Sequence, residues 1–315
     1  MNGNSQSMTE YAADLERVGV HVYPGTSGTI WTTHHSGTLM RRPTFHLEPT
    51  TAEEVRAALW RARAPVASYL LQPDADHPAN SWLYLCTDQT YSLEKLSSVM
   101  RRNVRRGLSE LHIAPLTAEQ LLEHGAPAFC DTRRRAELRD GTPEVFRERF
   151  VPHATLPSRL VLGAWKDGNI AAFLEITEVD DWAEIECFSM DALLQYRPND
   201  TLIYTALHHY LAERRYRVVS YGLSSIHAES NASGLHRFKT KVGFQTIPVH
   251  RAFVLHPLLR PLINRATLWG MKAAAQFRPE DNRLKLAYGA LAYMLGDTHM
   301  LEVAARRVND EHAGS

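Results

Sequence analysis

The sequence predicts an α/β (α+β) fold, and three observations support this prediction. Segments in which apolar residues recur at helical spacing alternate with short segments rich in branched and aromatic residues, which favour strands. Residues 159–190 contain three strand-like segments in succession, separated by turn residues, as in an antiparallel sheet. With 44% hydrophobic and 22% charged residues, the composition is that of a soluble globular protein, and 315 residues suffice for two modest domains.

In the first half of the chain, the pattern predicts helices that alternate with short strands. Thr50 and Glu53 match a capping box, so we expect a helix from there to residue 63. Strands are expected at residues 29–33, 65–71 and 81–87. Residues 127–150 are expected to be helical, and their mixed positive and negative charges indicate a solvated face.

Residues 91–111 form the most informative helix that the first half predicts, with Ser92 as its cap. Its apolar residues recur at helical spacing: Leu93, Leu96, Met100, Val104, Leu108 and Leu111. Beside this stripe, two pairs of arginines four residues apart stack as one ridge: Arg101 with Arg105, and Arg102 with Arg106. Like charges this close repel one another unless anions or carboxylates balance them. The ridge is therefore either a site for a phosphate-bearing ligand or a solvated face.

The second half has a clearer strand pattern. A tight turn at Asp167 and Gly168 joins two predicted strands, residues 159–165 and 170–179. A further strand is expected at residues 246–255.

The third strand of this half, residues 182–190, carries two acidic side chains. Because strand side chains repeat every two residues, Glu184 and Glu186 lie on one face. A helix capped by Asn199 or Asp200 is expected to follow, ending near residue 215. In the simplest interpretation both glutamates are solvent-facing strand residues.

Residues 218–244 predict a strand, a loop and a short basic helix. The strand ends in small residues, Gly222, Ser224 and Ser225, which leave room for a ligand beside the backbone. A strand end followed by a helix N-terminus commonly holds an anionic or acyl ligand. The alternative is an ordinary connection with a solvated basic helix.

Residues 257–315 are expected to be mostly helical and to lie outside the sheet pattern. In one interpretation, the uneven apolar face of these helices packs onto the domain or onto a second subunit. In the other, the face lies on a membrane surface, because Arg260, Arg265 and Lys272 accompany Trp269.

Bulk properties narrow the classes of function and location. The formal net charge is zero, from 35 basic and 35 acidic residues, so the protein as a whole is not a polyanion binder, although local basic patches stay open. Cys86, Cys130 and Cys187 are far apart and fit neither a metal site nor a disulfide framework, so we expect no metal and a cytoplasmic location. We expect no signal peptide and no integral membrane segment, since no stretch reaches roughly 18 apolar residues.

The order of hairpin, third strand, capped helix, strand, basic helix and final strand resembles the GNAT acyltransferase superfamily. In that family a central strand splays from its neighbour, an acyl-thioester cofactor lies in the gap, and its pyrophosphate sits at the N-terminus of the following helix. The resemblance puts this place at residues 195–201, where the chain has Pro198, Asn199 and Asp200 instead of the family's glycines. It also implies that backbone N–H groups of residues 188–190 face the reacting carbonyl.

Two segments resemble the Fem-type branch of that superfamily. Residues 91–108 contain its Leu-Ser-x-x-x-Arg-x-Asn core, and residues 238–244 match its Phe-Lys-x-Lys-x-Gly pattern. The resemblance implies two tandem GNAT-like domains, each a mixed, mostly antiparallel sheet flanked by helices. The domains would comprise residues 1–152 and residues 153–256, followed by a helical extension of residues 257–315.

The resemblance implies an acyltransferase, and three functions stay open. The first is an N-acyltransferase that moves an acyl group from acyl-CoA or an acyl carrier protein to an amino group of a small molecule. The second is a Fem-type aminoacyltransferase that uses aminoacyl-tRNA and acts on a peptide or cell-wall precursor. The third is a non-catalytic module that binds an anionic ligand. The donor would be a co-substrate rather than a permanently bound cofactor, and a homodimer is one expected assembly.

The resemblance and the residue types together give a set of candidate site residues. The expected catalytic residues are Glu184, Glu186, His227 and Tyr221. The expected cofactor-binding residues are Arg197, Asn199, Thr201, Ser224, Ser225, Lys239 and Lys241. The expected substrate-binding residues are Arg101, Arg105 and Glu229.

Overall fold

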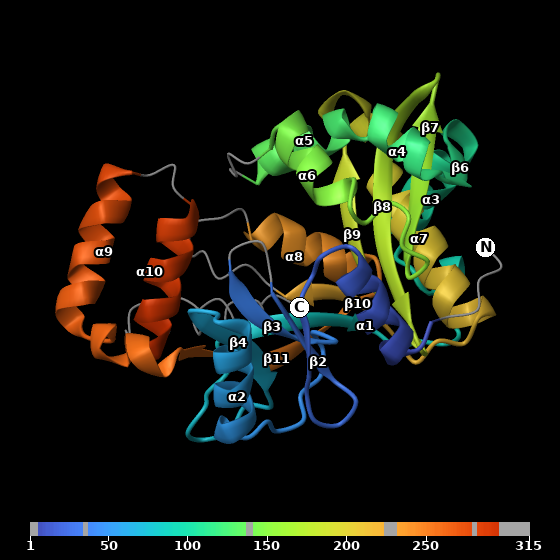
Figure 1. Cartoon of the computed structure of the whole chain (residues 1–315). Helices are drawn as coiled ribbons and strands as arrows, with labels where there is room; N and C mark the ends of the chain where they lie inside the picture. Colours follow the sequence, from blue (N-terminus) through green and yellow to red (C-terminus); the bar gives the residue numbers. More distant parts are fainter. Residues whose placement is uncertain (1–5, 34–36, 137–140, 224–231, 279–281, 296–315) are drawn as a thin grey trace. The chain divides into compact units, whose positions relative to one another are not determined.

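The computed structural model describes residues 6–33, 37–136, 141–223, 232–278 and 282–295 (Figure 1). The chain divides into two compact units, and each unit is assembled from several segments. Unit 1 comprises Met1–Asp14, Tyr84–Gly222 and Ser233–Thr246. Unit 2 comprises Leu15–Leu83, Leu223–Ala232 and Ile247–Ser315.

The sheet of unit 1 contains the predicted hairpin. Its strands follow the order β10 (Val218–Leu223), β9 (Trp182–Ser189), β8 (Asn169–Val179), β7 (Arg159–Lys166) and β6 (His112–Pro115). All neighbours are antiparallel except β10 and β9, which are parallel. Asp167 and Gly168 both have positive φ, 50° and 79°, so the β7–β8 turn has the form expected of an Asp-Gly hairpin.

Helices cover the sheet of unit 1 and complete its core. The helices before the hairpin are α3 (Ser98–Glu110), α4 (Ala118–His124), α5 (Ala126–Arg135) and α6 (Pro143–Phe150). Side chains of α4, α5 and α6 pack on β8 and β9 in a cluster that includes Leu121, Phe129, Phe146, Phe150, Phe173 and Phe188. After β9, the 3₁₀ turn η2 (Asp191–Tyr196) leads into α7 (Pro198–Leu207), which packs on the sheet and against α3. Burial of these aromatic rings contributes apolar stabilisation to unit 1.

Further elements of unit 1 lie around this framework. They are α1 (Met8–Arg17), of which the first part belongs to this unit, η1 (Leu93–Lys95), the π-helical turn η3 (His208–Glu213) and α8 (Ala232–Lys241). Tyr210 and Tyr216 both donate hydrogen bonds to the buried carboxylate of Glu178 on β8. Arg214 forms an ion pair with the same carboxylate, so the end of the α7–η3 helix is fixed to the sheet.

Unit 2 has its own mixed sheet. Its strands follow the order β1 (Val22–Pro24), β2 (Ile30–Thr33), β3 (Thr38–Arg42), β4 (Val66–Leu71) and β11 (Gln245–Leu255). Only β3 and β4 are parallel. Helix α2 (Ala52–Ala62) buries Val55, Ala58 and Leu59 against Trp31 and Leu39 of the sheet. β5 (Ser81–Cys86) crosses from unit 2 into unit 1.

The described residues after β11, 256–278 and 282–295, are mostly helical, as predicted. They form η4 (Pro257–Leu262), α9 (Arg265–Phe277) and α10 (Asn282–Met294), and α9 packs against α10 (Figure 1). These helices follow the part of β11 that belongs to unit 2.

Several predicted helix ends are wrong by one to several residues. The cap of α2 is Thr51, whose side chain accepts a hydrogen bond from the Glu54 N–H, rather than Thr50. Helix α3 begins at Ser98 rather than near residue 91, because the Ser97 hydroxyl caps it. The predicted helix at residues 127–150 is two helices, α5 and α6. A helix begins after the residue whose side chain accepts a hydrogen bond from one of its first free N–H groups. Several neighbouring residues in each segment are of a type that can cap a helix, so the sequence alone does not single out the right one.

The predicted domain ranges differ from the two compact units. Residue 152 falls inside unit 1, between α6 and β7, because β6 pairs with β7 and α5 packs on β9. The strand at residues 245–255 pairs with β4, so most of it belongs to unit 2. The division at residues 152 and 256 therefore stays a prediction, and the site below is described within unit 1.

Candidate active site

β9 and β10 pair over three residues and then separate. The pairing runs from Val218 opposite Trp182 to Ser220 opposite Glu184. Beyond this point β9 continues to Ser189 and β10 to Leu223, and no further pair joins them among the described residues. This is the splay that the GNAT resemblance implies.

Glu184 lies directly at the start of this splay. Gly222 on β10 has a φ of 69°, which favours glycine, and a Cβ at this residue would lie 3.9 Å from Glu184 Oε1. The carboxylate of Glu184 therefore lies beside β10, just after the last paired residues. Its side chain is half-buried. A half-buried carboxylate at the point where two strands separate is well situated to accept a proton from a bound amine.

Glu186, two residues further along β9, forms an ion pair with Arg149 of α6. Arg149 of α6 contacts both Glu186 and Glu175, and Arg159 contacts Glu175 at 2.7 Å. Loss of water around Glu186 would raise its pKa, but the charge and hydrogen bond of Arg149 outweigh this and hold the pKa below the ordinary value. A carboxylate with a lowered pKa is a weak base, which makes Glu186 a poor candidate for the base.

Lys239 of α8 is the most unusual ionisable group near the splay. Its side chain is only 3% exposed, and its Nζ donates to the backbone oxygen of Tyr221 over 3.1 Å. The rings of Tyr84 and Tyr221 lie 4.1 Å and 4.4 Å from Nζ, within the range of cation–π attraction. Among the residues that the structure describes, no carboxylate pairs with Lys239. Burial lowers the pKa of Lys239 to about 7, although the charge of Glu186 acts in the opposite direction.

The two tyrosines around Lys239 are themselves held in position. The Tyr84 hydroxyl lies 3.0 Å from His236 Nδ1, and the Tyr221 ring packs edge-on against Phe244 with ring centres 5.4 Å apart. Burial raises the pKa of Tyr221 well above its ordinary value, so this phenol stays protonated at neutral pH. Of the predicted site residues, Tyr221 and Lys239 are thus brought together, whereas Lys241 is exposed at the end of α8.

The N-terminus of α7 is closed by α3. The Asn103 amide of α3 donates to Asp200 Oδ2 over 2.9 Å, and a Cβ at Gly107 would overlap Thr201 Oγ1. Thr201 is fully buried, and its hydroxyl donates to the Arg197 carbonyl oxygen over 2.9 Å. Burial raises the pKa of Asp200. This helix end is therefore filled with packed side chains where the resemblance implies a pyrophosphate.

The residues predicted to cap α7 and to bind the cofactor there have other roles. Arg197, in the left-handed region with a φ of 62°, occupies the cap position, and Pro198 is the first helical residue. Neither Asn199 nor Asp200 caps the helix, so that prediction is wrong. Asn199 accepts a weak hydrogen bond from the Cys187 thiol, with sulfur and oxygen 3.4 Å apart. The packing of α3 thus does not favour a cofactor pyrophosphate at Arg197, Asn199 and Thr201.

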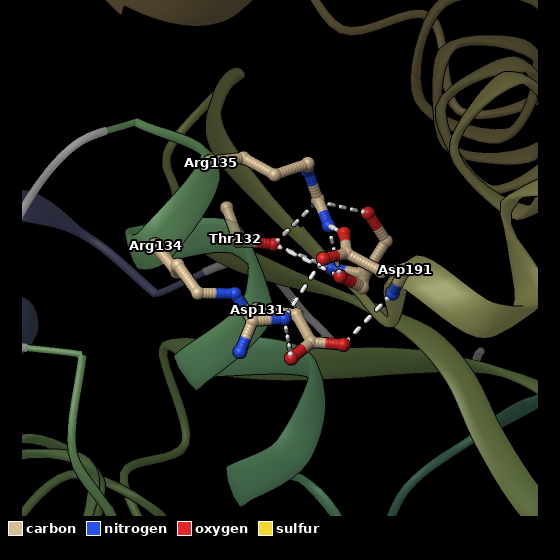
Figure 2. A network of polar contacts seen from close by, with 6 residues as sticks. Asp131, Thr132, Arg134, Arg135 and Asp191 are labelled. Atoms are coloured by element: carbon tan, nitrogen blue, oxygen red, sulfur yellow. Dashed lines mark hydrogen bonds and ion pairs between the residues drawn. The ribbon is translucent and has the colours of Figure 1, made fainter.

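A polar network fixes the far end of β9 (Figure 2). Thr132 Oγ1 of α5 accepts the Ser189 N–H over 2.7 Å, and the Met190 N–H donates to the Ala171 carbonyl. Arg135 donates to the Ser189 carbonyl over 3.0 Å and to its hydroxyl over 2.7 Å. The expectation that N–H groups of residues 188–190 face a substrate carbonyl is therefore wrong for Ser189 and Met190, whose N–H groups already have partners.

The same network holds the start of η2. Arg134 bridges Asp131 and Asp191 with two contacts of 2.8 Å, and the Asp191 N–H donates to Asp131 (Figure 2). Arg135 also contacts Asp191. The sequence pattern indicated a solvated face here, and it missed that these arginines tie α5 to β9.

The arginines of α3 present the opposite case. Arg101, Arg102, Arg105 and Arg106 line a shallow surface depression together with Ser98 and Ser109. Arg101 donates to the Glu94 carbonyl over 3.2 Å, but none of the four arginines forms an ion pair within the described part of the chain. Their positive charge is therefore available to an anionic ligand.

Four of the predicted site residues lie outside the described residues: Ser224, Ser225, His227 and Glu229. In the described part of the chain, no group of three or more His, Cys, Asp or Glu residues is arranged to hold a metal ion. No helix within the described ranges has the length and apolar character needed to cross a membrane.

Comparison with known proteins gives the fold. No protein-family model and no curated protein sequence matches the chain. Among solved structures, it is similar to FemX, with 11% identity and a TM-score of 0.54 over 83% of this chain and 95% of that chain. It is also similar to the C-terminal domain (DUF2156) of a putative lysylphosphatidylglycerol synthetase from Agrobacterium fabrum. That match has 19% identity and a TM-score of 0.52, over 84% of this chain and 91% of that chain.

A third similar structure is a conserved protein of unknown function from Bacteroides thetaiotaomicron, with 9% identity and a TM-score of 0.51 over 79% of this chain and 90% of that chain. At these identities the likeness shows the fold alone. The chain has the GNAT/Fem-like fold, so the predicted α/β class with mixed, mostly antiparallel sheets flanked by helices is confirmed.

Proposed function

We propose that this chain, whose fold is that of FemX and of the synthetase domain, is an acyltransferase that moves an aminoacyl group from tRNA to an amine. The observation that carries the proposal is the contact of α3 with α7. One face of α3 fills the N-terminus of α7, and another presents four arginines that have no carboxylate partner in the described chain.

The closed α7 end argues against coenzyme A as the donor. In the GNAT arrangement, a pyrophosphate needs free N–H groups at this helix end. Here the Asn103 amide, the Thr201 hydroxyl and the Asp200 carboxylate occupy that space, and the carboxylate would repel a phosphate. A donor whose phosphates bind elsewhere fits this geometry better.

The arginines of α3 favour a donor with a phosphate backbone. Arginines at i and i+4 are about 6 Å apart along a helix, so the two pairs form a row of charges rather than a single anion site. Guanidinium groups bind phosphate oxygens in pairs, and such contacts position a nucleic acid without reading its sequence. The zero net charge of the chain is compatible with this, because phosphate contacts are local.

The residues at the splay can then carry out the transfer. The amine nitrogen attacks the ester carbonyl, the C–N bond forms, and Glu184 accepts the proton that the nitrogen loses. Lys239, in its protonated form, stabilises the oxyanion of the tetrahedral intermediate. The C–O bond to the ribose then breaks, and the Tyr221 phenol donates a proton to the leaving oxygen and regains one from the protonated Glu184 through water.

The test is a donor comparison. The purified protein is incubated with a mixture of amines and, separately, with aminoacyl-tRNA, acyl-CoA and an acyl carrier protein, and products are identified by mass spectrometry. We expect transfer from aminoacyl-tRNA, and a loss of roughly 100-fold or more in kcat/KM for Lys239→Met and Glu184→Gln. Arg101→Gln with Arg105→Gln is expected to raise KM with kcat retained.

The matched control is Arg56→Gln, an exposed arginine of α2 in unit 2, which is expected to leave both constants unchanged. Transfer from acyl-CoA alone would overturn the tRNA proposal and support the acyl-thioester function. No transfer from any donor would indicate the non-catalytic binding module.

A further inference from the structure

The segment that follows β11 exposes large apolar side chains next to basic ones. Leu258, Leu262, Trp269 and Phe277 are 71%, 52%, 76% and 86% exposed, values far above those of ordinary core residues. Residues 256–278 contain no Asp or Glu, but they contain Arg260, Arg265, Lys272 and Arg278. A balanced chain of zero net charge thus concentrates positive charge and exposed apolar surface in one short segment.

The helical spacing of α9 places its exposed apolar and basic side chains on one face of the helix. Asn264 caps the helix by accepting the Thr267 N–H over 2.9 Å, and α10 packs against the helix (Figure 1). At about 100° per residue, Trp269 and Phe277 lie about 80° apart on the helix circumference. Arg265 and Lys272, seven residues apart, lie along one edge of the same exposed side.

Smaller residues complete this face. Ala266 and Gly270 are exposed, and Ala273 is half-buried within the same arc. The residues that point toward the protein, such as Leu268 and Met271, are half-buried. The exposed arc of α9 is therefore largely apolar, with Arg265 and Lys272 along one edge. η4, which precedes α9 in the chain, adds the exposed side chains of Leu258 and Leu262.

We propose that this face, formed by η4 and α9, binds the surface of an anionic lipid bilayer. A helix with apolar and aromatic residues on one side and cations at its edge lies in the interface plane, with its apolar side among the acyl chains. Trp is favoured at the headgroup level, and Arg and Lys extend toward lipid phosphates. The proposal is independent of the donor and acceptor of the proposed function.

A second copy of the chain fits the same face less well. In a symmetric dimer the same patch lies on both subunits, so Arg265 and Lys272 of one copy would approach the cations of the other. The segment offers no acidic residue to offset that repulsion. Exposed leucines and a phenylalanine beside cations also match acyl chains under phosphates better than they match an acidic protein surface.

The test is flotation of the purified full-length chain with vesicles of phosphatidylcholine alone and of phosphatidylcholine with phosphatidylglycerol. We expect binding to the anionic vesicles only. Replacing both aromatic residues, Trp269→Ser with Phe277→Ser, should weaken binding by at least about tenfold, because it removes the inserted apolar surface. Arg265→Gln with Lys272→Gln should weaken it by roughly 25-fold, from about fivefold per charge.

Val151→Ser, at an exposed apolar residue of unit 1, is the matched control and should bind as the unchanged protein does. Sedimentation without lipid, over a range of protein concentrations, tests the alternative occupant. Absence of vesicle binding, or binding that the two double substitutions leave unchanged, would overturn the proposal. Concentration-dependent dimers that Trp269→Ser with Phe277→Ser abolishes, with no vesicle binding, would identify the face as a subunit interface instead.

Discussion

Two groups of arginines in unit 1 behave in opposite ways. Arg134 and Arg135 at the end of α5, with Arg149 of α6, contact carboxylates of Asp131, Glu175, Glu186 and Asp191. The four arginines of α3 have no carboxylate partner in the described chain. The first group holds the β9 end of the splay, whereas the second leaves its charge open to a ligand.

The difference shows that charge alone does not reveal the role of an arginine. Both groups are runs of basic residues on helices, and the α5 run has acidic residues nearby in sequence. The two groups differ in what the neighbouring elements offer. β9 and η2 place Glu186 and Asp191 beside the arginines of α5 and α6, whereas neither element places a carboxylate beside the arginines of α3 among the described residues. A paired arginine contributes to the fold, and an unpaired row of arginines is free to bind.

The first prediction concerns an arginine with carboxylate partners, Arg149, whose removal is expected to lower the stability of the fold strongly. Among the described residues, Arg149→Met leaves the buried Glu175 paired with Arg159 alone and leaves Glu186 without an ion-pair partner. We therefore expect a loss of roughly 3 kcal/mol in the free energy of unfolding. Arg102→Met, in the unpaired row, should change it by less than about 0.5 kcal/mol. Urea unfolding of both variants measures the difference, and equal losses would break the comparison.

The next prediction tests the close contact of α3 with α7, at Gly107 and Thr201. Gly107→Ala forces a Cβ into Thr201 Oγ1, and we expect a loss of about 1–3 kcal/mol in the free energy of unfolding. Thr201→Ala removes the overlapping atom, so the double variant should lose less than the sum of the two single changes. Gly270→Ala on α9 is the control, because a Cβ there meets nothing within 4 Å. Additive losses would show that α3 does not depend on this close approach.

A third prediction concerns the pH dependence of stability that Lys239 causes, since this buried amine has no carboxylate ion-pair partner among the described residues. Its pKa of about 7 in the folded protein lies below the roughly 10.4 of an unfolded chain, so between these values the unfolded state binds more protons. Below pH 7 the buried charge therefore lowers the free energy of unfolding by its full amount. As the pH rises from 7 toward about 10, the free energy of unfolding increases by up to about 1.4 kcal/mol per pH unit.

Lys239→Met removes this dependence. The variant should be more stable than the unchanged protein at pH 6, and its advantage should shrink at pH 9. Chemical unfolding at both pH values measures it. An advantage that is the same at both pH values would mean that Lys239 stays protonated throughout, as the ion-paired arginines do.

The sequence predicted the elements of the site that depend on local spacing. The Asp167–Gly168 turn, the shared face of Glu184 and Glu186, and the arginine ridge of α3 follow from periodicity and turn chemistry, and the structure has all three. The splay of β9 and β10 was expected only through the family resemblance. Local patterns fix the elements because each depends on neighbours within a few residues.

What the sequence did not reveal depends on contacts between distant segments. Tyr84 at the Lys239 ammonium and Thr132 at the Ser189 N–H come from elements far away along the chain, and nothing local marks either residue. The cap of α7 was missed because a left-handed Arg197 competes with two better capping residues that follow it. Packing of α3 over that helix end decides the outcome, and packing is not visible in spacing.

The path of the chain also limits how the protein can form and be divided. The backbone passes from one unit to the other after Asp14, Leu83, Gly222, Ala232 and Thr246. Unit 1 cannot be completed during synthesis until its last segment has been made, by which point most of unit 2 already exists. Fragments made by cutting the chain at residue 152 or 256 would lack strands of their own sheets, so the two units should fold only as one continuous chain. Folding should also be slow for a chain of this length, because many contacts join residues that are far apart in the sequence.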